Sequence, residues 1–432
     1  MVSAQNVGGS SPRVVLVVTD GMRRDFISTE NTPVIANLKS TGTWFASHRS
    51  VFPSCTRVVS SSVATGCLPA KHGLAGNSVC LIEDGKLTLH DAGKPQFVDD
   101  KRRLTGRVLN IPTMAERLAS MNGAIIFNNV SPGAAYVHDP DGHGHVYHRA
   151  ASYGPGRVPI NGPNALDIVQ GIEGDTAATE RFVDEVVLQR RPTLAVLWLS
   201  EPDTTQHITP LGSPRHLEML RQTDRNVARV LAAVSQCREE GEDILVMVAS
   251  DHGHETTVDY VDIAAEMVDA GLKRSLDSDD VVVAPNGTAA LIYVDPGQVS
   301  DIEAIRNFLE SQPWCGQIFD PQNFRDVGIP AGGNLAFGVA MAWDDGTNEY
   351  GVPGRSYAVL SANGQKKPAG CGQHGGLGRY EQSPYLIAEG RGFKAGETVT
   401  SETSAVEIAP TVLHFLGRAV ADLDGRALQE LN

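Results

Sequence analysis

The sequence lacks the features that mark membrane, secreted and disulfide-stabilised proteins. No apolar run approaches the roughly 20 residues that a membrane helix needs. Residues 1–13 show no charged segment followed by an apolar one, so we expect no secretory signal. The six cysteines form no Cys-x-x-Cys pair, and in a chain of 432 residues we expect reduced thiols. These absences favour a cytoplasmic protein without a membrane partner.

Positive charge is also scarce. The chain has 36 Lys and Arg against 51 Asp and Glu, a formal net charge of −15. This excess argues against nucleic acid or an anionic membrane as a partner. A small anionic substrate remains compatible, because bound metal ions reverse the sign of the field within one cleft. The sequence shows no internal repeat and no signal for an oligomeric state.

Apolar runs alternate with helical patterns over the first 250 residues. This alternation predicts an α/β fold with a doubly wound, mostly parallel sheet. We expect irregular chain over residues 78–110 and a long loop over 131–163. The expected strands cover 14–19, 124–130, 194–199 and 244–249, and the expected helices cover 31–42, 111–123, 175–190 and 214–241.

The alternation of apolar runs and helical patterns stops after His254. Residues 255–370 mix short strands, one helical pattern and Gly/Pro-rich turns. We interpret this stretch as an inserted, smaller α+β cap domain. The catalytic core would then comprise residues 1–254 and 371–432 and end in a helix over 404–417.

Three of the apolar runs end abruptly in carboxylates and histidines. Asp20 follows the first, Asp203 and His207 follow the second, and Asp251 and His252 follow the third. Runs that are apolar on both faces are typical of buried parallel strands, whose carboxyl ends share one edge of the sheet. Carboxylate and imidazole ligands suit Zn²⁺, although Mn²⁺ or Fe bind similar sites.

A centre with two metal ions roughly 3.5–4 Å apart needs more ligands than these five. His374, flanked by glycines in QHGGLG, is the natural sixth. Thr56 precedes a run of small residues that could open a helix, where a metal and the helix dipole would activate its hydroxyl. Asn77 could donate a hydrogen bond to a phosphoryl oxygen.

These motifs together resemble the alkaline phosphatase superfamily. The branch they resemble most contains type I phosphodiesterases, nucleotide pyrophosphatases and phosphonoacetate hydrolases. The similarity covers residues 13–254 and 371–432. It is carried, in the family's order, by TDGMR, PSCTxxxxxxxATGxxPxxHGxxGN, EPDTTQH, SDHG and QHGG.

The resemblance implies a two-zinc hydrolase of phosphate esters or diesters. Thr56 would attack phosphorus and form a phospho-threonine that water then hydrolyses. The Asn77 amide and the backbone N–H of Arg57 would hold the phosphoryl oxygens. One zinc would be bound by Asp203, His207 and His374, and the other by Asp20, Asp251, His252 and the Thr56 hydroxyl.

Departures from the family leave the substrate open. Arg57 stands where nucleotide pyrophosphatases place an aromatic residue that stacks on the base, so we expect it to contact substrate. Residues 127–139 lack the lysines with which phosphonoacetate hydrolases hold a carboxylate. This absence argues against phosphonoacetate itself as the substrate. Cleavage of a C–P bond in a carbonyl-activated phosphonate, with Arg57 or Arg149 binding the acid, is one alternative. A non-catalytic metal-binding homologue is the other.

Several further polar residues have plainer interpretations. We expect Lys101, Arg102 and Arg103 to form a solvated face, and Cys55 to be a small packed residue. His254 either orients a metal ligand or occupies a turn. The four histidines of the 131–163 stretch predict a solvated loop at the cleft, in which one of them touches substrate: His138, His143, His145 and His148.

Overall fold

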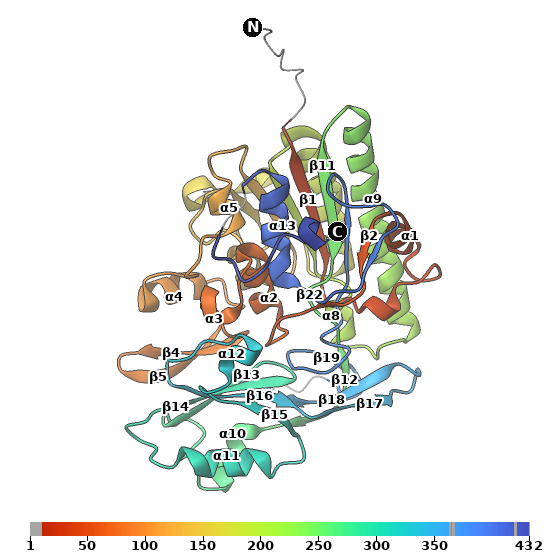
Figure 1. Ribbon diagram of the computed structural model, residues 1–432. Coiled ribbons are helices and arrows are strands. Elements are labelled where there is room, and N and C mark those ends of the chain that lie inside the picture. Colours follow the sequence, from red (N-terminus) through yellow and green to blue (C-terminus); the bar gives the residue numbers. More distant parts are fainter. Residues whose placement is uncertain (1–10, 363, 365–367, 419–420, 432) are drawn as a thin grey trace.

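The structure, a computed structural model, describes residues 11–431 apart from 363, 365–367 and 419–420 (Figure 1). The expected absence of a secretory signal concerns the N-terminus, of which residues 1–10 lie outside the described residues. Within the described chain, every helix is too short or too polar to span a bilayer.

A ten-stranded sheet forms the centre of the molecule, in the order β21-β2-β20-β11-β1-β10-β6-β7-β8-β9. Its middle five strands, from β11 to β7, run parallel. They are β11 (Ile244–Ala249), β1 (Arg13–Thr19), β10 (Leu194–Leu199), β6 (Ala124–Asn128) and β7 (His145–Tyr147). The flanking strands are β21 (Thr398–Val399), β2 (Thr43–Phe45), β20 (Leu386–Glu389), β8 (Ser152–Gly154) and β9 (Val158–Ile160).

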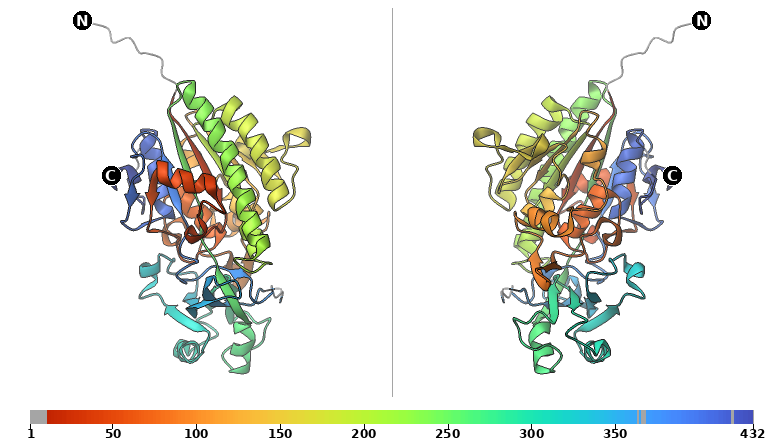
Figure 2. Two further views of the ribbon diagram at one scale, coloured as in Figure 1. Left: turned by 90° about the vertical axis from the view of Figure 1, so that its right-hand side faces the viewer. Right: turned by 90° about the vertical axis from the view of Figure 1, so that its left-hand side faces the viewer.

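Helices cover both faces of this sheet (Figures 1 and 2). Along β1, Val14, Leu16 and Val18 face one apolar core, whereas Val15 and Val17 face the other. The first core contains α2 (Thr56–Thr65), α6 (Pro132–Tyr136) and α13 (Ile408–Phe415). The second contains α1 (Pro33–Thr41), α7 (Ile172–Arg181), its π-helical continuation η4 (Phe182–Arg190) and α9 (Pro214–Glu239). The expected α/β class with a mostly parallel, doubly wound sheet is confirmed.

Two four-stranded sheets and three helices lie beneath the carboxyl ends of the central strands (Figure 1). Strands of both sheets, together with α10 and α11, form a third apolar core, whereas Phe324 of α12 belongs to the first core. The division into a core of 1–254 and 371–432 and a cap of 255–370 stays a prediction. The strands are β12 (Glu255–Val261), β13 (Val281–Pro285), β14 (Ala289–Val294), β15 (Cys315–Phe319), β16 (Leu335–Met341), β17 (Trp343–Thr347), β18 (Pro353–Val359) and β19 (Gly372–Gln373), and the helices are α10 (Ile263–Asp269), α11 (Ile302–Glu310) and α12 (Phe324–Val327).

The expectation of irregular chain over residues 78–110 is wrong. A hairpin of β4 (Ser78–Glu83) and β5 (Lys86–Asp91) is followed by α4 (Phe97–Thr105). The hairpin turns at Asp84 and Gly85, both with positive φ, and Asp-Gly is a strong hairpin signal. Lys101 is buried in α4 rather than solvated, whereas Arg102 and Arg103 form surface ion pairs.

Two other sequence expectations differ from the structure. The stretch 131–163 contains α6 and the short strands β7, β8 and β9, which extend the central sheet. Strands of three residues are too short to show a periodic pattern, so they read as loop. The helix expected over 111–123 is reduced to α5 (Met114–Arg117).

Candidate metal centre

The three strands that end in acidic residues lie side by side in the centre of the sheet. Val18 in β1 is level with Trp198 in β10 and with Ala249 in β11. The loops that follow these strands therefore begin at the same edge, as expected for parallel neighbours.

The first group of possible ligands surrounds the Nε2 atom of His252. Thr56 Oγ1 lies 3.1 Å from this nitrogen, Asp251 Oδ2 lies 3.2 Å away, and Asp20 Oδ1 lies 3.5 Å away. All four residues are buried. Donors that bind one tetrahedral zinc at 2.0–2.2 Å lie roughly 3.3 Å from one another. The spacing of this group therefore fits a single cation.

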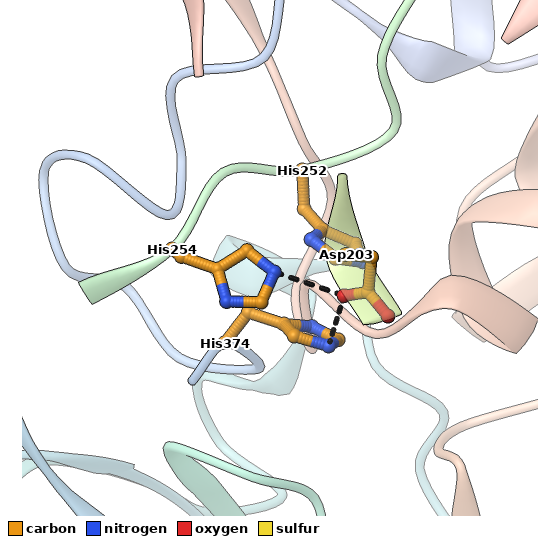
Figure 3. Close-up of side chains that lie close together, drawn as sticks. All are labelled: Asp203, His252, His254 and His374. Atoms are coloured by element: carbon orange, nitrogen blue, oxygen red, sulfur yellow. Dashed lines mark hydrogen bonds and ion pairs between the residues drawn. The ribbon is translucent and has the colours of Figure 1, made fainter. Parts of the chain in front are cut away.

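The second group surrounds Asp203, the first residue of α8 (Asp203–Gln206). Its Oδ1 lies 3.4 Å from Nε2 of His207 and 3.5 Å from Nε2 of His374. His254 Nε2 lies closer, at hydrogen-bond distance of 2.9 Å from the same oxygen (Figure 3). The two wider separations match the spacing of zinc ligands, whereas the shorter one suits an imidazole that orients the carboxylate.

The two groups are immediate neighbours. The rings of His252 and His374 stack with centroids 3.6 Å apart and an interplanar angle of 11°. Figure 3 shows these two rings together with Asp203 and His254. Possible ligand atoms of these four residues all lie within 4.8 Å of one another. The arrangement has donors for two closely spaced cations.

In the first group, Asp20 and Asp251 each have one oxygen that accepts a hydrogen bond and one that remains available to a cation. Trp198 Nε1 donates to Asp20 Oδ2 at 2.8 Å, and the backbone N–H of Gly21 donates to Asp251 Oδ1 at 3.0 Å. Within the described chain, Asp20 Oδ1 and Asp251 Oδ2 accept no hydrogen bond although both are buried. Buried anionic oxygens of this kind are costly unless a cation neutralises them, so the donor set fits a metal ion.

Burial and neighbouring charges shift the pKa values of residues in both groups. Burial, followed by repulsion from Asp251 and Asp203, raises the pKa of Asp20 well above its usual value. Burial would also raise the pKa of Asp203, but the neighbouring imidazoles, led by His207, hold it well below its usual value. Burial and the neighbouring His252 hold the pKa of His374 well below its ordinary value. A neutral imidazole is the form that binds metal.

Thr56 is the first residue of α2, and Cys55 is the N-cap. The helix therefore directs its positive N-terminal end at the threonine hydroxyl. The backbone N–H of Arg57 donates to Asn77 Oδ1 at 3.1 Å. From the family resemblance we expect the backbone N–H of Arg57 and the side-chain amide of Asn77 both to donate to substrate. The bond instead engages that N–H in positioning Asn77, which leaves the Asn77 Nδ2 group as the donor.

A cleft of about 790 Å³ opens beside the two groups. Thr56, Asp203, His207 and His374 line it, together with Arg57 and Asn77. Arg149, named from the sequence as a possible grip for an acid, also lines the cleft, as do Lys94 and Asn286, which the sequence analysis missed. The volume is within the usual range for small-molecule sites.

Two positioning residues had no recognised signal in the sequence. Trp198 orients Asp20 from the middle of an apolar run, where a buried indole N–H needs a partner. Asn286 lies in the turn between β13 and β14, and its Oδ1 accepts the backbone N–H of Asn77 at 2.6 Å. Its sequence context, Pro-Asn-Gly, predicts only a turn.

The histidines of the 131–163 stretch lie apart from both groups. His138 and His148 are buried rather than solvated, and burial lowers the pKa of His138 to about 4. The ring of His138 packs against Trp198, with centroids 5.3 Å apart. These histidines belong to neither cluster of possible metal ligands in the described chain. Cys55 is buried, as expected.

Comparisons with known proteins agree with the motifs. The family profile described as type I phosphodiesterase / nucleotide pyrophosphatase matches residues 14–312. A venom phosphodiesterase of Macrovipera lebetinus is 26% identical over 252 residues, which are 56% of this chain and 25% of the relative. Human ectonucleotide pyrophosphatase/phosphodiesterase family member 1 is 25% identical over 257 residues, covering 57% of this chain and 24% of that protein. The chain thus spans about a quarter of these relatives.

Solved structures share the whole fold. Murine ectonucleotide pyrophosphatase / phosphodiesterase 5, in an inactive threonine-to-alanine form in complex with AMP, aligns with a TM-score of 0.69 at 15% identity, covering 98% of this chain and 100% of that one. The human counterpart aligns with a TM-score of 0.69 at 15% identity, covering 97% and 99%. The profile match covers well over half of the sequence and confirms the resemblance found in its motifs. The chain therefore belongs to the type I phosphodiesterase/nucleotide pyrophosphatase family.

Proposed function

We propose that this protein hydrolyses phosphate esters, and diesters in particular, with Thr56 as the nucleophile and two divalent cations as cofactors. The ligand types favour Zn²⁺ for both. One observation carries the proposal: the Thr56 hydroxyl lies 3.1 Å from His252 Nε2, within the same buried group as Asp20 and Asp251. A threonine that only began helix α2 would not need these possible metal ligands around its hydroxyl.

The first cation would be held by Asp20, Asp251, His252 and Thr56, and the second by Asp203, His207 and His374. Bound there, the ions would supply Lewis-acid stabilisation of the attacking and leaving oxygens. The threonine Oγ1 forms the new bond to phosphorus while the bond to the leaving alcohol breaks. The phospho-threonine then reacts with water, which releases the phosphoryl product and restores the hydroxyl.

Two groups of the chain assist this displacement. The Nδ2 amide of Asn77 donates to a non-bridging phosphoryl oxygen, because its Oδ1 is already held by the Arg57 backbone. The N-terminal end of α2 favours negative charge next to Thr56. Both groups are fixed before substrate arrives, and preorganised donors of this kind stabilise charge that develops in the transition state.

The names of similar proteins support this choice of chemistry. The matched relatives are a phosphodiesterase and a nucleotide pyrophosphatase/phosphodiesterase. A structural neighbour is titled inactive with a threonine replaced by alanine. The substrate we propose is a small anionic phosphorus compound. The cytoplasmic location stays a prediction, which fractionation of the native cells would check.

Hydrolysis of a C–P bond in a carbonyl-activated phosphonate is the second candidate, favoured by the presence of Arg57 and Arg149 in the cleft. A panel of bis-aryl phosphates, nucleotides and phosphonates separates the two reactions. C–P cleavage releases inorganic phosphate from a phosphonate, whereas diester hydrolysis releases an alcohol.

Hydrolysis of bis(4-nitrophenyl) phosphate by the zinc-loaded protein tests the proposal. Thr56→Ala should lower kcat by about 10³-fold or more, because it removes the attacking oxygen. Thr56→Ser should retain part of the activity. Thr65→Ala is the matched control, since Thr65 ends the same helix and its hydroxyl bonds to nearby backbone groups, the carbonyl of Ser61 and the N–H of Cys67.

Metal content and melting temperature should be measured on each variant. A chelator should abolish turnover by the wild-type protein, and added zinc should restore it. Turnover by Thr56→Ala at the wild-type rate would remove Thr56 from the mechanism. Full loading with zinc but no hydrolysis of any phosphorus compound in the panel would favour the non-catalytic alternative.

A further inference from the structure

The cleft beside the metal groups has a positively charged wall in a strongly acidic protein. Arg57, Lys94 and Arg149 all line it, although the chain has a formal net charge of −15. The acidic residues that line the cleft are Asp203, already assigned to a metal, and Asp91. Asp91 is partly engaged, because its Oδ1 accepts the backbone N–H of Gly93 at 2.8 Å.

Arg57 packs against the turn that carries Lys94. The guanidinium of Arg57 lies directly against Gly93, so closely that a side chain at Gly93 would collide with Arg57 Nη2. Lys94 follows Gly93 in the chain. The absence of a side chain at position 93 thus allows Arg57, next to the nucleophile, to pack against the turn that carries a second cation.

The same turn packs against the segment that Arg149 binds. The backbone N–H of Gly133, in α6, approaches the carbonyl of Gly93 at 3.4 Å, and a side chain at Gly133 would collide with the carbonyl of Ala92. Just before α6, the Arg149 guanidinium donates to the backbone carbonyls of Asn129 and Val130. The three cations therefore belong to one connected wall.

These cations form no close ion pair with the described protein, although the charge of Asp175 acts on Arg149 from farther away. Within the described part of the chain, no carboxylate oxygen lies within 4.0 Å of a side-chain nitrogen of Arg57, Lys94 or Arg149. The side-chain partners of Arg149 are the neutral Asn129 and Gln170. The buried Nε of Arg57 has no hydrogen-bond partner among the described residues. Half-buried cations such as Arg57 are usually paired, so this wall is suited to an anion from outside.

We propose that this wall binds a second anionic group of the substrate, a carboxylate or a phosphate, while the scissile phosphorus lies at the metal groups. The inference rests on the proposed function for the position of the phosphorus. Tyr260 is the aromatic residue among those that line the cleft, which lacks Phe and Trp in its described lining. The site thus selects small substrates with two anionic groups over neutral or base-bearing esters.

Binding of non-hydrolysed probes to the zinc-loaded protein tests this inference by calorimetry. Propylphosphonate has one anionic group, whereas 3-phosphonopropionate adds a carboxylate and ethane-1,2-diphosphonate adds a second phosphonate. We expect at least one of the two bifunctional probes to bind about tenfold tighter than propylphosphonate, as charge-assisted hydrogen bonds provide. The probe that gains affinity identifies the second group.

Substitutions test whether the wall causes the gain in affinity for the bifunctional probes. Lys94→Met should reduce it about fivefold, the upper range for an exposed ion pair, and Arg57→Met should reduce it further. Lys86→Met is the matched control, because Lys86 is an exposed lysine of the adjacent strand β5 and does not line the cleft. Lys86→Met should retain the full gain.

Equal affinity of the wild-type protein for all three probes would overturn the inference, and so would an undiminished gain in both Lys94→Met and Arg57→Met. Hydrolysis is not required for this readout. A protein with the binding preference but without diesterase activity would contradict the proposed function and leave the anion site standing. Diesterase activity with equal affinities would overturn the anion site alone.

Discussion

At the scale of the residue, the site depends on hydrogen bonds that hold one oxygen of a carboxylate and leave the other available to a cation. The indole of Trp198 holds Asp20 in this way, and the backbone of Gly21 holds Asp251. The sequence predicted five of the seven proposed ligands from carboxylates and histidines at the ends of apolar runs. It predicted His374 and Thr56 from their motifs and from the family resemblance. It did not predict Trp198, because a tryptophan inside such a run is indistinguishable from ordinary core.

Trp198→Phe should weaken zinc binding by about 10–100-fold, the usual effect of removing a group that orients a metal ligand. The phenyl ring preserves most of the packing but lacks the N–H that donates to Asp20 Oδ2. Titration with buffered zinc measures the affinity. Trp314→Phe is a matched control, because it removes an equivalent bond at 2.9 Å to Glu266, in a separate apolar core. Equal affinities in the wild type and Trp198→Phe would show that the indole does not position Asp20.

Lys101 provides a pH-dependent test at the same scale. Burial lowers its pKa from 10.5 to about 8. Below pH 8 the folded protein must bury a charge, and this cost disappears as the pH rises toward 10.5, where the unfolded chain also loses the proton. Lys101→Met should therefore raise the free energy of unfolding at pH 7 by about 1–3 kcal/mol, and the gain should vanish near pH 10.5.

Urea denaturation at pH 7 and at pH 10.5 measures the two differences. Lys86→Met, at an exposed position, should change neither value appreciably. A gain for Lys101→Met that is the same at both pH values would show that the effect comes from packing and not from the charge.

At the scale of the element, the turn between β13 and β14 braces two parts of the site. Asn286 Oδ1 accepts the backbone N–H groups of Asn77 and Ser78, and the backbone N–H of Thr288 donates to the carbonyl of His374 at 3.0 Å. The sequence predicted the long central strands from their continuous apolar runs. It could not predict this contact, because the turn is more than 200 residues from Asn77.

Asn286→Ala should lower kcat/KM for a diester by about 10–100-fold, because small displacements of a positioned donor such as Asn77 are costly. Zinc content should not change, since Asn286 is outside both groups of ligands. Asn348→Ala is the control: Asn348 Oδ1 also accepts two backbone N–H groups, those of Tyr350 and Val352, but within its own turn between β17 and β18. If both variants retained wild-type kcat/KM, the turn would have no role in positioning Asn77.

At the scale of the whole molecule, the fold brings together side chains that are separated by more than 300 positions. Asp20 and His374 meet at one edge of the central sheet because parallel strands align their carboxyl ends there, and because the smaller sheets hold the QHGG loop against this edge. The order of elements predicted the sheet, and the family motifs predicted which residues meet. The three short strands that extend the sheet, and the hairpin of residues 78–91, came only from the structure.

The number of metal ions per chain tests the central claim most directly. Elemental analysis of folded protein equilibrated with zinc should find two ions per chain. Asp251→Asn and Asp203→Asn should each retain about one, because each removes a carboxylate from a different group of ligands. At most one ion in the fully loaded wild-type protein would contradict the two-metal centre, and so would full retention of both ions in both variants.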